Sequence, residues 1–272
     1  MLNAIKTETH PKGLPYRISF FDTLPSTNTY LAALAGDGEG EGAVAVAFSQ
    51  SEGKGRFARR FYSPLGTGVY MSLLLRPDFA AEHFPLLTPL AGVAAAEAAE
   101  ALSGKSIGIK WVNDLYLGEK KVAGILAESG TSQNANNSLQ NSRFVILGIG
   151  INLSLPETVP AELSGVIGAL FEKGTAKEFL EKAREDFVLG FLSRFHAYYE
   201  KMPSRTFMDE YRRRSVLIGK SVRLHNAAFD TAKTGEGKTV TVLDVTDSGA
   251  LLVRGEDGKE RAVFAGEVTL SL

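Results

Sequence analysis

The sequence predicts an α+β protein with a small β domain at its C-terminal end. Three observations lead to this prediction: short strands with close turns follow one another over residues 107–128, a long amphipathic helix covers residues 175–201, and five short strands fill residues 221–272. Strands and helices therefore gather in separate runs along the chain, which is the pattern of an α+β fold.

In the first part of the chain, polar or glycine-containing segments separate three strands and two helices. The polar turn before residue 29 holds several candidate N-caps for a helix that ends at Gly36. Pro89 is expected to open an alanine-rich helix that ends at Gly104, and its small side chains allow close packing on a sheet. The apolar segments between these features predict strands at residues 16–21, 43–48 and 69–75.

The middle of the chain is expected to be antiparallel. Residues 107–128 have the pattern of a β-meander, and the apolar segment 144–155 predicts a buried strand. The polar stretch 129–141 between them carries no pattern of regular structure. A capping box of Thr175 and Glu178 is expected to open the long helix, whose core-facing stripe contains Phe179, Phe187, Phe191, Phe195 and Tyr198.

The C-terminal strands are short and are separated by turn signals such as Asp247-Ser248-Gly249, which indicates a small barrel. We place the domain boundary near Leu217, so that the two expected domains are residues 1–217 and 218–272.

Composition excludes several classes of function. The chain has no cysteine, which rules out disulfides, thiolate zinc sites and a cysteine nucleophile. The formal net charge of -1 provides no overall field for nucleic acid or anionic lipid, so a basic site has to be local. Neither a signal peptide nor a membrane-spanning segment is apparent, and we expect a cytoplasmic, soluble protein without a DNA or membrane partner.

The loop from Gln50 to Arg60 is the first candidate site, because it places four cationic side chains and two glycines between strands. Glycines allow the backbone to approach a ligand, and lysine and arginine neutralise anionic oxygens. An anionic ligand is the functional interpretation, and a solvated basic loop is the alternative. The loop matches neither the Walker motif nor the dinucleotide fingerprint.

Three further segments are candidates. Lys110 ends a strand beside the only tryptophan, Trp111, where its charge could meet a carboxylate or phosphoryl oxygen. Asn113 and the residue after it also suit a plain hairpin turn, and the tryptophan also suits packing. Ser26-Thr27-Asn28 and the strand end at Asn152 are weak signals when each is taken alone.

Taken together, these segments resemble the biotin protein ligases. Ser-Thr-Asn, Gln-x-x-Gly-Lys-Gly-Arg, Lys-Trp-x-Asn-Asp-Leu-Tyr followed by Lys-x-Ala-Gly-Ile-Leu-x-Glu, and Gly-x-Gly-Ile-Asn occur in the order and spacing of that family. The resemblance extends from about Phe20 to the C-terminus. It implies the mixed sheet of the biotin and lipoate ligases, related to class II synthetases, followed by an SH3-like barrel.

The resemblance also implies a two-step reaction in which no protein nucleophile takes part. Biotin and ATP form biotinyl-5′-AMP and pyrophosphate, and a lysine of a biotin carboxyl carrier domain then takes the biotinyl group. Mg²⁺ would accompany ATP, held mainly by its phosphates, so the protein itself is expected to provide no metal site. The carrier domain of a biotin-dependent carboxylase is the expected partner. A homodimer is possible, and the sequence does not decide the oligomeric state.

By similarity, the site residues form four sets that partly overlap. The expected catalytic residues are Lys110 and Arg56, facing the reacting carboxylate and α-phosphate. Biotin would contact Ser26, Thr27, Asn28, Gln50, Gly53, Lys54, Arg56, Lys110 and Trp111. The nucleotide would contact Arg56, Arg59, Lys110, Asn113 and Asn152. In the C-terminal domain, Arg261 and Glu267 are the expected contacts with the active site.

The chain also departs from the family pattern. Lys54, Phe57 and Ala58 replace an arginine, an arginine and a glycine of the usual loop, and Val112 stands where a proline is usual. We assign no role to Phe57 or Ala58. With about 20 residues before the first matching strand, we expect no N-terminal DNA-binding domain.

Two alternative functions remain at this stage. A lipoate ligase of the same fold would form an acyl adenylate of a different acid, although the Gly-Lys-Gly-Arg loop and the C-terminal barrel argue against it. A non-catalytic protein that binds biotin or nucleotide would have a similar sequence. Turnover distinguishes the last alternative from an enzyme.

Overall fold

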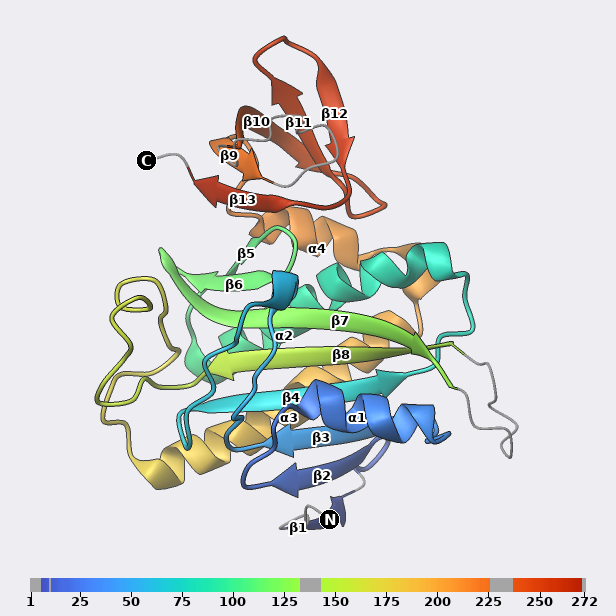
Figure 1. The fold of residues 1–272 in the computed structure, drawn as a ribbon, viewed down its shortest axis with the longest axis vertical. Helices are drawn as coiled ribbons and strands as arrows, with labels where there is room; N and C mark the ends of the chain where they lie inside the picture. The colour runs from blue at the N-terminus through green and yellow to red at the C-terminus, as the bar shows by residue number, and fades with distance from the viewer. Residues whose placement is uncertain (1–5, 10, 133–142, 226–236, 271–272) are drawn as a thin grey trace.

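A computed structural model describes residues 6–9, 11–132, 143–225 and 237–270, and its larger part is a mixed eight-stranded sheet (Figure 1). The strand order is β1-β2-β3-β4-β8-β7-β6-β5, in which β2 and β3 are parallel and all other neighbours are antiparallel. The strands are β1 (Lys6–Thr9), β2 (Arg17–Phe21), β3 (Ala43–Ala47), β4 (Gly68–Leu75), β5 (Gly108–Lys110), β6 (Asp114–Leu117), β7 (Lys120–Thr131) and β8 (Arg143–Asn152). The expected meander and buried strand are therefore confirmed, and β1 is an addition that the sequence analysis missed.

Helices cover both faces of this sheet. In Figure 1, α1 (Thr27–Gly36) lies in front of it, while α2 (Leu87–Ser103) and α3 (Lys177–Tyr199) lie behind it. A further helix, α4 (Phe207–Arg214), for which we had no prediction, packs against α2 and lies below β13 in Figure 1. Short 3₁₀ turns complete the list: η1 (Arg56–Ala58), η2 (Ala81–Leu86) and η3 (Met202–Ser204).

The ends of α1 and α2 follow from local chemistry. Ser26 is the N-cap of α1, and its hydroxyl oxygen accepts the Thr29 N–H at 3.4 Å. At the other end of α1, the Arg76 guanidinium donates to the Ala35 carbonyl at 3.0 Å, which satisfies a terminal acceptor. Helix α2 ends as expected at Gly104, whose φ of 68° is accessible to glycine without strain.

The predicted start of α3 was wrong. Its N-cap is Ala176, and no side chain caps the helix. Thr175 lies one residue before this N-cap, and its hydroxyl donates to the Glu172 carbonyl at 2.7 Å. Of the predicted aromatic stripe, Phe191 is fully buried, whereas Phe179 is 48% exposed and packs edge-on against Phe171.

The two faces of β8 explain where a ligand can bind. On the face toward α2 and α3, alternate residues are apolar and buried: Val145, Leu147, Ile149 and Ile151. On the opposite face, Phe144 and Ile146 pack with α1, and the next positions on that face are Gly148 and Gly150. At these two positions, near the start of α1, strand β8 therefore places no side chain on this face.

The C-terminal part forms a five-stranded antiparallel sheet of order β12-β11-β10-β9-β13, as the strand pattern predicted. Its strands are β9 (Ser221–His225), β10 (Lys238–Val245), β11 (Leu251–Gly255), β12 (Glu260–Val263) and β13 (Glu267–Leu270). The indole N–H of Trp111 donates to the Gly249 carbonyl at 2.9 Å and so joins the two parts. None of the helices in the described ranges is long and apolar enough to cross a membrane.

Replacing Phe191 by alanine should lower the free energy of unfolding by about 3–5 kcal/mol, because it leaves a cavity between α3 and its neighbours. Urea denaturation followed by circular dichroism measures this change. Phe179→Ala is the matched control on the same helix. It should cost less than about 1 kcal/mol, because that ring is half exposed. Equal losses for the two variants would contradict the assignment of the buried face.

Candidate active site

Three glycines on β7 and β8 form the floor of a pocket at the sheet face that α1 leaves open. Gly124 of β7 pairs with Gly150 of β8, and Gly148 lies one row further along. A Cβ atom at Gly150 would come within 2.4 Å of the Phe61 ring, and one at Gly148 within 2.1 Å of the Asn28 amide oxygen. Larger residues at these positions would displace the side chains that line the pocket.

One end of the pocket offers uncharged hydrogen-bonding groups. The Gln50 amide oxygen accepts the Thr27 N–H at 2.8 Å, and the Gln50 amide nitrogen donates to the Ser63 hydroxyl at 3.1 Å. Ser26 and Thr27, at the start of α1, line the same end and are each 3% exposed. The structure therefore brings together three of the residues that the resemblance assigned to biotin.

The loop after Gln50 closes over this pocket as a tight turn. Gly55 N–H donates to the Arg59 carbonyl at 2.8 Å, and Phe61 N–H donates to the Gly53 carbonyl at 2.8 Å. At the tip, Phe57 has a φ of 56°, a conformation that non-glycine residues seldom adopt. A Cβ on Gly53 would lie 2.4 Å from the Phe61 carbonyl oxygen, which explains the glycine at this position.

Arg56 points from this loop toward the base of the pocket. Its guanidinium donates to the Asn113 amide oxygen at 3.1 Å and to the Gly266 carbonyl at 3.3 Å. Burial lowers the pKa of Arg56, and the charges of Asp114 and Glu267 oppose this shift. A guanidinium stays protonated near neutral pH, and both of its hydrogen-bond acceptors here are uncharged. Its charge is therefore available to an anion.

Lys110 and Lys121 bring two more charges to the pocket. The Lys121 ammonium forms an ion pair with Asp114 at 2.7 Å. Lys110 forms no ion pair with any residue in the described part of the chain, and its ammonium lies 5.6 Å from the centre of the Tyr116 ring. Burial lowers the pKa of Lys110, an effect that the nearby charge of Asp114 opposes. An anionic ligand would relieve the cost of this half-buried cation.

The turn between β5 and β6 is held from two sides. The Asn113 carbonyl accepts the Ile125 N–H at 2.9 Å, and the Asn113 side chain donates to the Ile125 carbonyl at 3.0 Å. From α4, the Tyr211 hydroxyl donates to the Val112 carbonyl at 3.1 Å. Burial raises the pKa of Tyr211, so its hydroxyl keeps the proton that it donates. This support fixes the backbone between the lysine and asparagine side chains.

The C-terminal sheet completes the pocket through Glu267 at the start of β13. Its carboxylate accepts two hydrogen bonds from Arg59, at 2.5 and 2.6 Å, in a bidentate pair. The hydrogen bonds from Arg59 hold the pKa of Glu267 below its ordinary value. Arg261, the other residue expected at this contact, pairs instead with Asp257 inside the C-terminal sheet.

Some predicted residues lie elsewhere. Asn152 donates to the Gly168 carbonyl at 2.9 Å and is not among the residues that line the pocket, so its nucleotide contact stays a prediction. Conversely, Lys121 lines the pocket although no site role was predicted for it, and it is the first residue of the motif Lys-x-Ala-Gly-Ile-Leu-x-Glu. The position of Lys121 two strands after Lys110, at the start of the last strand of the meander, was the available signal.

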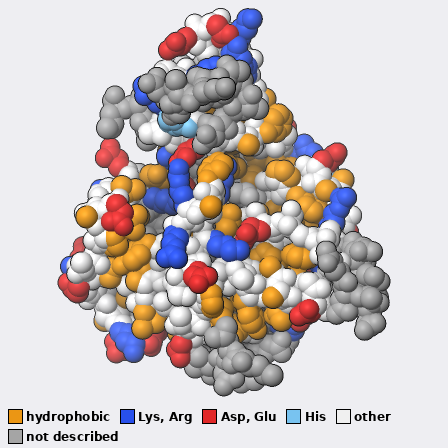
Figure 2. Space-filling view, viewed as in Figure 1, with side chains coloured by type: hydrophobic (Ala, Val, Ile, Leu, Met, Phe, Trp, Pro, Cys, Tyr) orange, Lys and Arg blue, Asp and Glu red, His pale blue; other side chains and the backbone are white. Residues whose placement is uncertain are grey.

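Positive charge dominates the assembled pocket. Figure 2 shows lysine and arginine side chains gathered in the middle of this face, below the C-terminal sheet. Six cationic residues line the pocket against two acidic ones: Lys54, Arg56, Arg59, Arg60, Lys110 and Lys121, with Asp114 and Glu267. A chain of net charge -1 thus concentrates its cations where an anionic ligand would bind.

Comparison with known proteins identifies the family. The model of the biotin/lipoate A/B protein ligase family matches residues 20–152, and that of the biotin protein ligase C terminal domain matches residues 231–271. The bifunctional ligase/repressor BirA of Bacillus subtilis is 32% identical over 269 residues, which are 98% of this chain and 76% of that protein. This chain belongs to the biotin protein ligases.

Other members of the family agree over much of the chain. The biotin--[acetyl-CoA-carboxylase] ligase of Paracoccus denitrificans is 28% identical over 79% of this ligase and 85% of its own length. The biotin protein ligase of Aquifex aeolicus, solved in complex with biotin and ATP, superposes with a TM-score of 0.70 at 26% identity. That superposition covers 93% of this ligase and 98% of the other chain.

The contact between the loop and the C-terminal sheet should depend on pH. Because Arg59 depresses the pKa of Glu267, the pair contributes to closure above the ordinary carboxyl value of 4.5 and is lost as the pH falls through the lowered pKa. At pH 7, Glu267→Gln should therefore speed hydrogen exchange of residues 53–61. After correction for intrinsic exchange, the native ligase should approach the variant only below pH 4.5.

Glu260→Gln is the matched control for this measurement, because Glu260 pairs with Arg254 within the same sheet and does not touch the loop. It should leave exchange of the loop unchanged. Identical loop exchange in all three proteins at pH 7 would contradict a closing role for the pair of Arg59 and Glu267.

Proposed function

We propose that this ligase activates the carboxylate of biotin with ATP and transfers the biotinyl group to a lysine of a biotin carboxyl carrier domain. In the first step, a carboxylate oxygen attacks the α-phosphorus, and the bond to the β-phosphate oxygen breaks, releasing pyrophosphate. In the second step, the lysine amine attacks the acyl carbon of biotinyl-5′-AMP. The bond to the phosphate oxygen breaks, AMP leaves, and the amine loses a proton.

The observation that carries this proposal is the arrangement of charge in the pocket. Its uncharged end, at Ser26, Thr27 and Gln50, suits the ring of biotin, which offers N–H donors and a carbonyl acceptor. Its charged end holds Lys110, which has no carboxylate partner in the described part of the chain, and Arg56, whose hydrogen-bond acceptors are uncharged. Two anionic substrates can approach each other there because these cations offset their repulsion.

The protein groups act by position and charge. Lys110 and Arg56 face the reacting oxygens, where negative charge moves as pyrophosphate departs. Lys121 lines the same region and belongs with them, although Asp114 partly neutralises it. The loop from Lys54 to Arg60 covers the adenylate, which limits its loss to water.

The proposal also includes the expected metal ion, acceptor protein, location and oligomeric state. Mg²⁺ enters with ATP as part of the substrate, and no cluster of His, Cys, Asp or Glu within the described ranges could hold a metal ion. The acceptor is the carrier domain of an acetyl-CoA carboxylase, by analogy with the named relative from Paracoccus denitrificans. A cytoplasmic location and a homodimer stay predictions.

Exchange of labelled pyrophosphate into ATP tests the first step, because that step is reversible and needs no carrier. Biotin should support exchange, and lipoate should not. A pocket that pairs with the N–H groups and carbonyl of a cyclic urea rejects an acid that lacks them by a large factor. Equal exchange with lipoate would overturn the choice of biotin, and binding of biotin without any exchange would favour a non-catalytic protein.

Replacing Lys110 by alanine should slow the exchange about 10²- to 10³-fold, because it removes a cation from the reacting oxygens. The dissociation constant for biotin should change less than the rate. Lys182→Ala, an exposed lysine that pairs with Asp186 on α3, is the control and should exchange normally. If Lys110→Ala folds and exchanges pyrophosphate at a near-normal rate, Lys110 does not contribute to adenylation and serves only in packing.

A further inference from the structure

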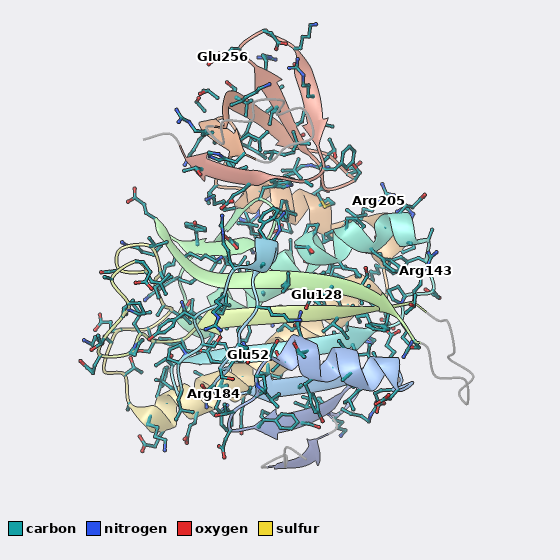
Figure 3. All side chains as sticks on the ribbon, in the orientation of Figure 1. Glu52, Glu128, Arg143, Arg184, Arg205 and Glu256 are labelled. Atoms are coloured by element: carbon teal, nitrogen blue, oxygen red, sulfur yellow. The ribbon has the colours of Figure 1, made fainter. Side chains whose placement is uncertain are left out.

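Hydrogen bonds between described residues join the C-terminal sheet to the larger part of the protein at two places. One is the end of β10 with the turn after it, residues 245–250, and the other is the start of β13 at Glu267. These contacts lie on different strands, and β9 separates β10 from β13 in the sheet. Figure 3 labels Glu256, in the turn after β11, at the end of the C-terminal sheet that lies far from the larger part.

The first contact includes the indole N–H of Trp111, which donates to the Gly249 carbonyl at 2.9 Å. An indole nitrogen has one proton and cannot accept, so this bond uses the whole polar capacity of the side chain. The accepting turn is itself ordered, because Gly249 N–H donates to the Thr246 carbonyl at 2.8 Å. Trp111 is 4% exposed and directly follows Lys110. The C-terminal sheet is thus bonded to the neighbour of the predicted catalytic lysine.

Helix α4 supports the same turn through Arg212. The Nε of its guanidinium donates to the Val245 carbonyl at 2.7 Å, and another nitrogen donates to the Asp247 carboxylate. The Asp244 carboxylate lies 3.8 Å from Nε. A guanidinium presents its donors in one rigid plane, so these contacts fix both the distance and the direction of the turn.

The second contact holds the loop that covers the pocket. The Gly266 carbonyl accepts a hydrogen bond from Arg56, and the Glu267 carboxylate accepts two from Arg59. We call this contact the loop anchor. Strands β10, β9 and β13 form a continuous hydrogen-bonded ladder from the first contact to the second, and each of them buries valine side chains in the core. A packed ladder of this kind moves as a unit, so a shift of the turn would also displace the loop anchor.

We propose that Trp111 and Arg212 are positioning residues that fix the C-terminal sheet where the loop anchor can hold the loop over the pocket and retain the adenylate. Neither of them forms a hydrogen bond with the loop in the described part of the chain, so both act through the sheet. The resemblance placed Trp111 beside biotin and gave no role to Arg212. This inference rests on the proposed function, because the adenylate is what the closed loop retains.

Hydrogen exchange of residues 53–61, in the full-length protein without substrates, tests the positioning of the loop anchor. Trp111→Phe keeps an aromatic ring in the pocket wall but leaves the Gly249 carbonyl without its donor. Arg212→Met keeps an apolar stem on α4 and removes the hydrogen bonds to Val245 and Asp247. Each variant should speed loop exchange at pH 7 at least about threefold, because the loss of one hydrogen bond changes an opening equilibrium by that order.

Arg213→Met is the matched control, because Arg213 is the next residue of α4 and pairs with Glu210 of the same helix. It should leave loop exchange unchanged. The amides of β10 and β11 should exchange slowly in all of these variants, because the sheet is displaced and not unfolded. Equal acceleration in these strands and in the loop would show that Trp111 and Arg212 only stabilise the C-terminal sheet, and the inference would be wrong.

A double-mutant comparison determines whether the effect passes through the loop anchor. In a Glu267→Gln background the loop anchor is already weakened, so Trp111→Phe and Arg212→Met should each speed loop exchange by a smaller factor than in the native background. Equal factors in the two backgrounds would contradict transmission through the sheet. If one of the two variants does not fold, the other decides the question by the same comparison.

The half-life of biotinyl-5′-AMP on the enzyme, measured after free substrates have been removed by filtration, connects the loop anchor to the reaction. Trp111→Phe and Arg212→Met should each shorten it at least about threefold, and Arg213→Met should not. Faster loop exchange with an unchanged half-life would overturn the role of the anchored loop in retaining the adenylate. If the native protein forms no adenylate, the proposed function fails, and loop exchange alone decides whether the two residues position the loop anchor.

Discussion

The site depends on the absence of side chains from one half of a sheet face whose other half is fully packed. Strand β8 meets both demands by placing Phe144 and Ile146 beneath the body of α1, Gly148 beneath the Asn28 side chain in its first turn, and Gly150 beneath the Phe61 ring. Side chains that line the pocket can then lie close to the backbone, while the opposite face of the same strand stays in the main core. The fold thus supplies a rigid floor, and the groups that recognise a ligand come from α1 and the loops.

The same geometry explains how a chain of almost zero net charge can form a strongly positive pocket. Its cations come from three separate segments, the loop before β4, the end of β5 and the start of β7, which the sheet order brings to one edge of the floor. Acidic partners are present for only some of these cations: Asp114 pairs with Lys121, and Glu267 pairs with Arg59, whereas Lys110 forms no ion pair with the residues that the structure describes. Stabilising a reaction by positioned charge requires such an excess of cations over acidic partners in the pocket.

Local features were predictable from the sequence, and features that depend on distant contacts were not. Most of the strands and the Ser26 cap follow from nearby residues, although the expected box at Thr175 failed because Ala176 is the N-cap of α3. The motifs located most of the pocket because their spacing could be compared with a family. Asn28 forms hydrogen bonds with Ser72, 44 positions away, and with Glu128 of β7, 100 positions away. No pattern in the sequence predicts these contacts.

The bidentate contact between Arg59 and Glu267 also has a consequence for the order of biosynthesis. The two residues are 208 positions apart in the chain, so the loop leaves the ribosome well before its partner exists. At about 5–20 residues per second, that interval is roughly 10 to 40 s. During it, a nascent chain can already hold the sheet and its glycine floor, but the loop lacks its anchor. The contact between Arg59 and Glu267 can therefore form only after residue 267 has been made, long after the loop itself.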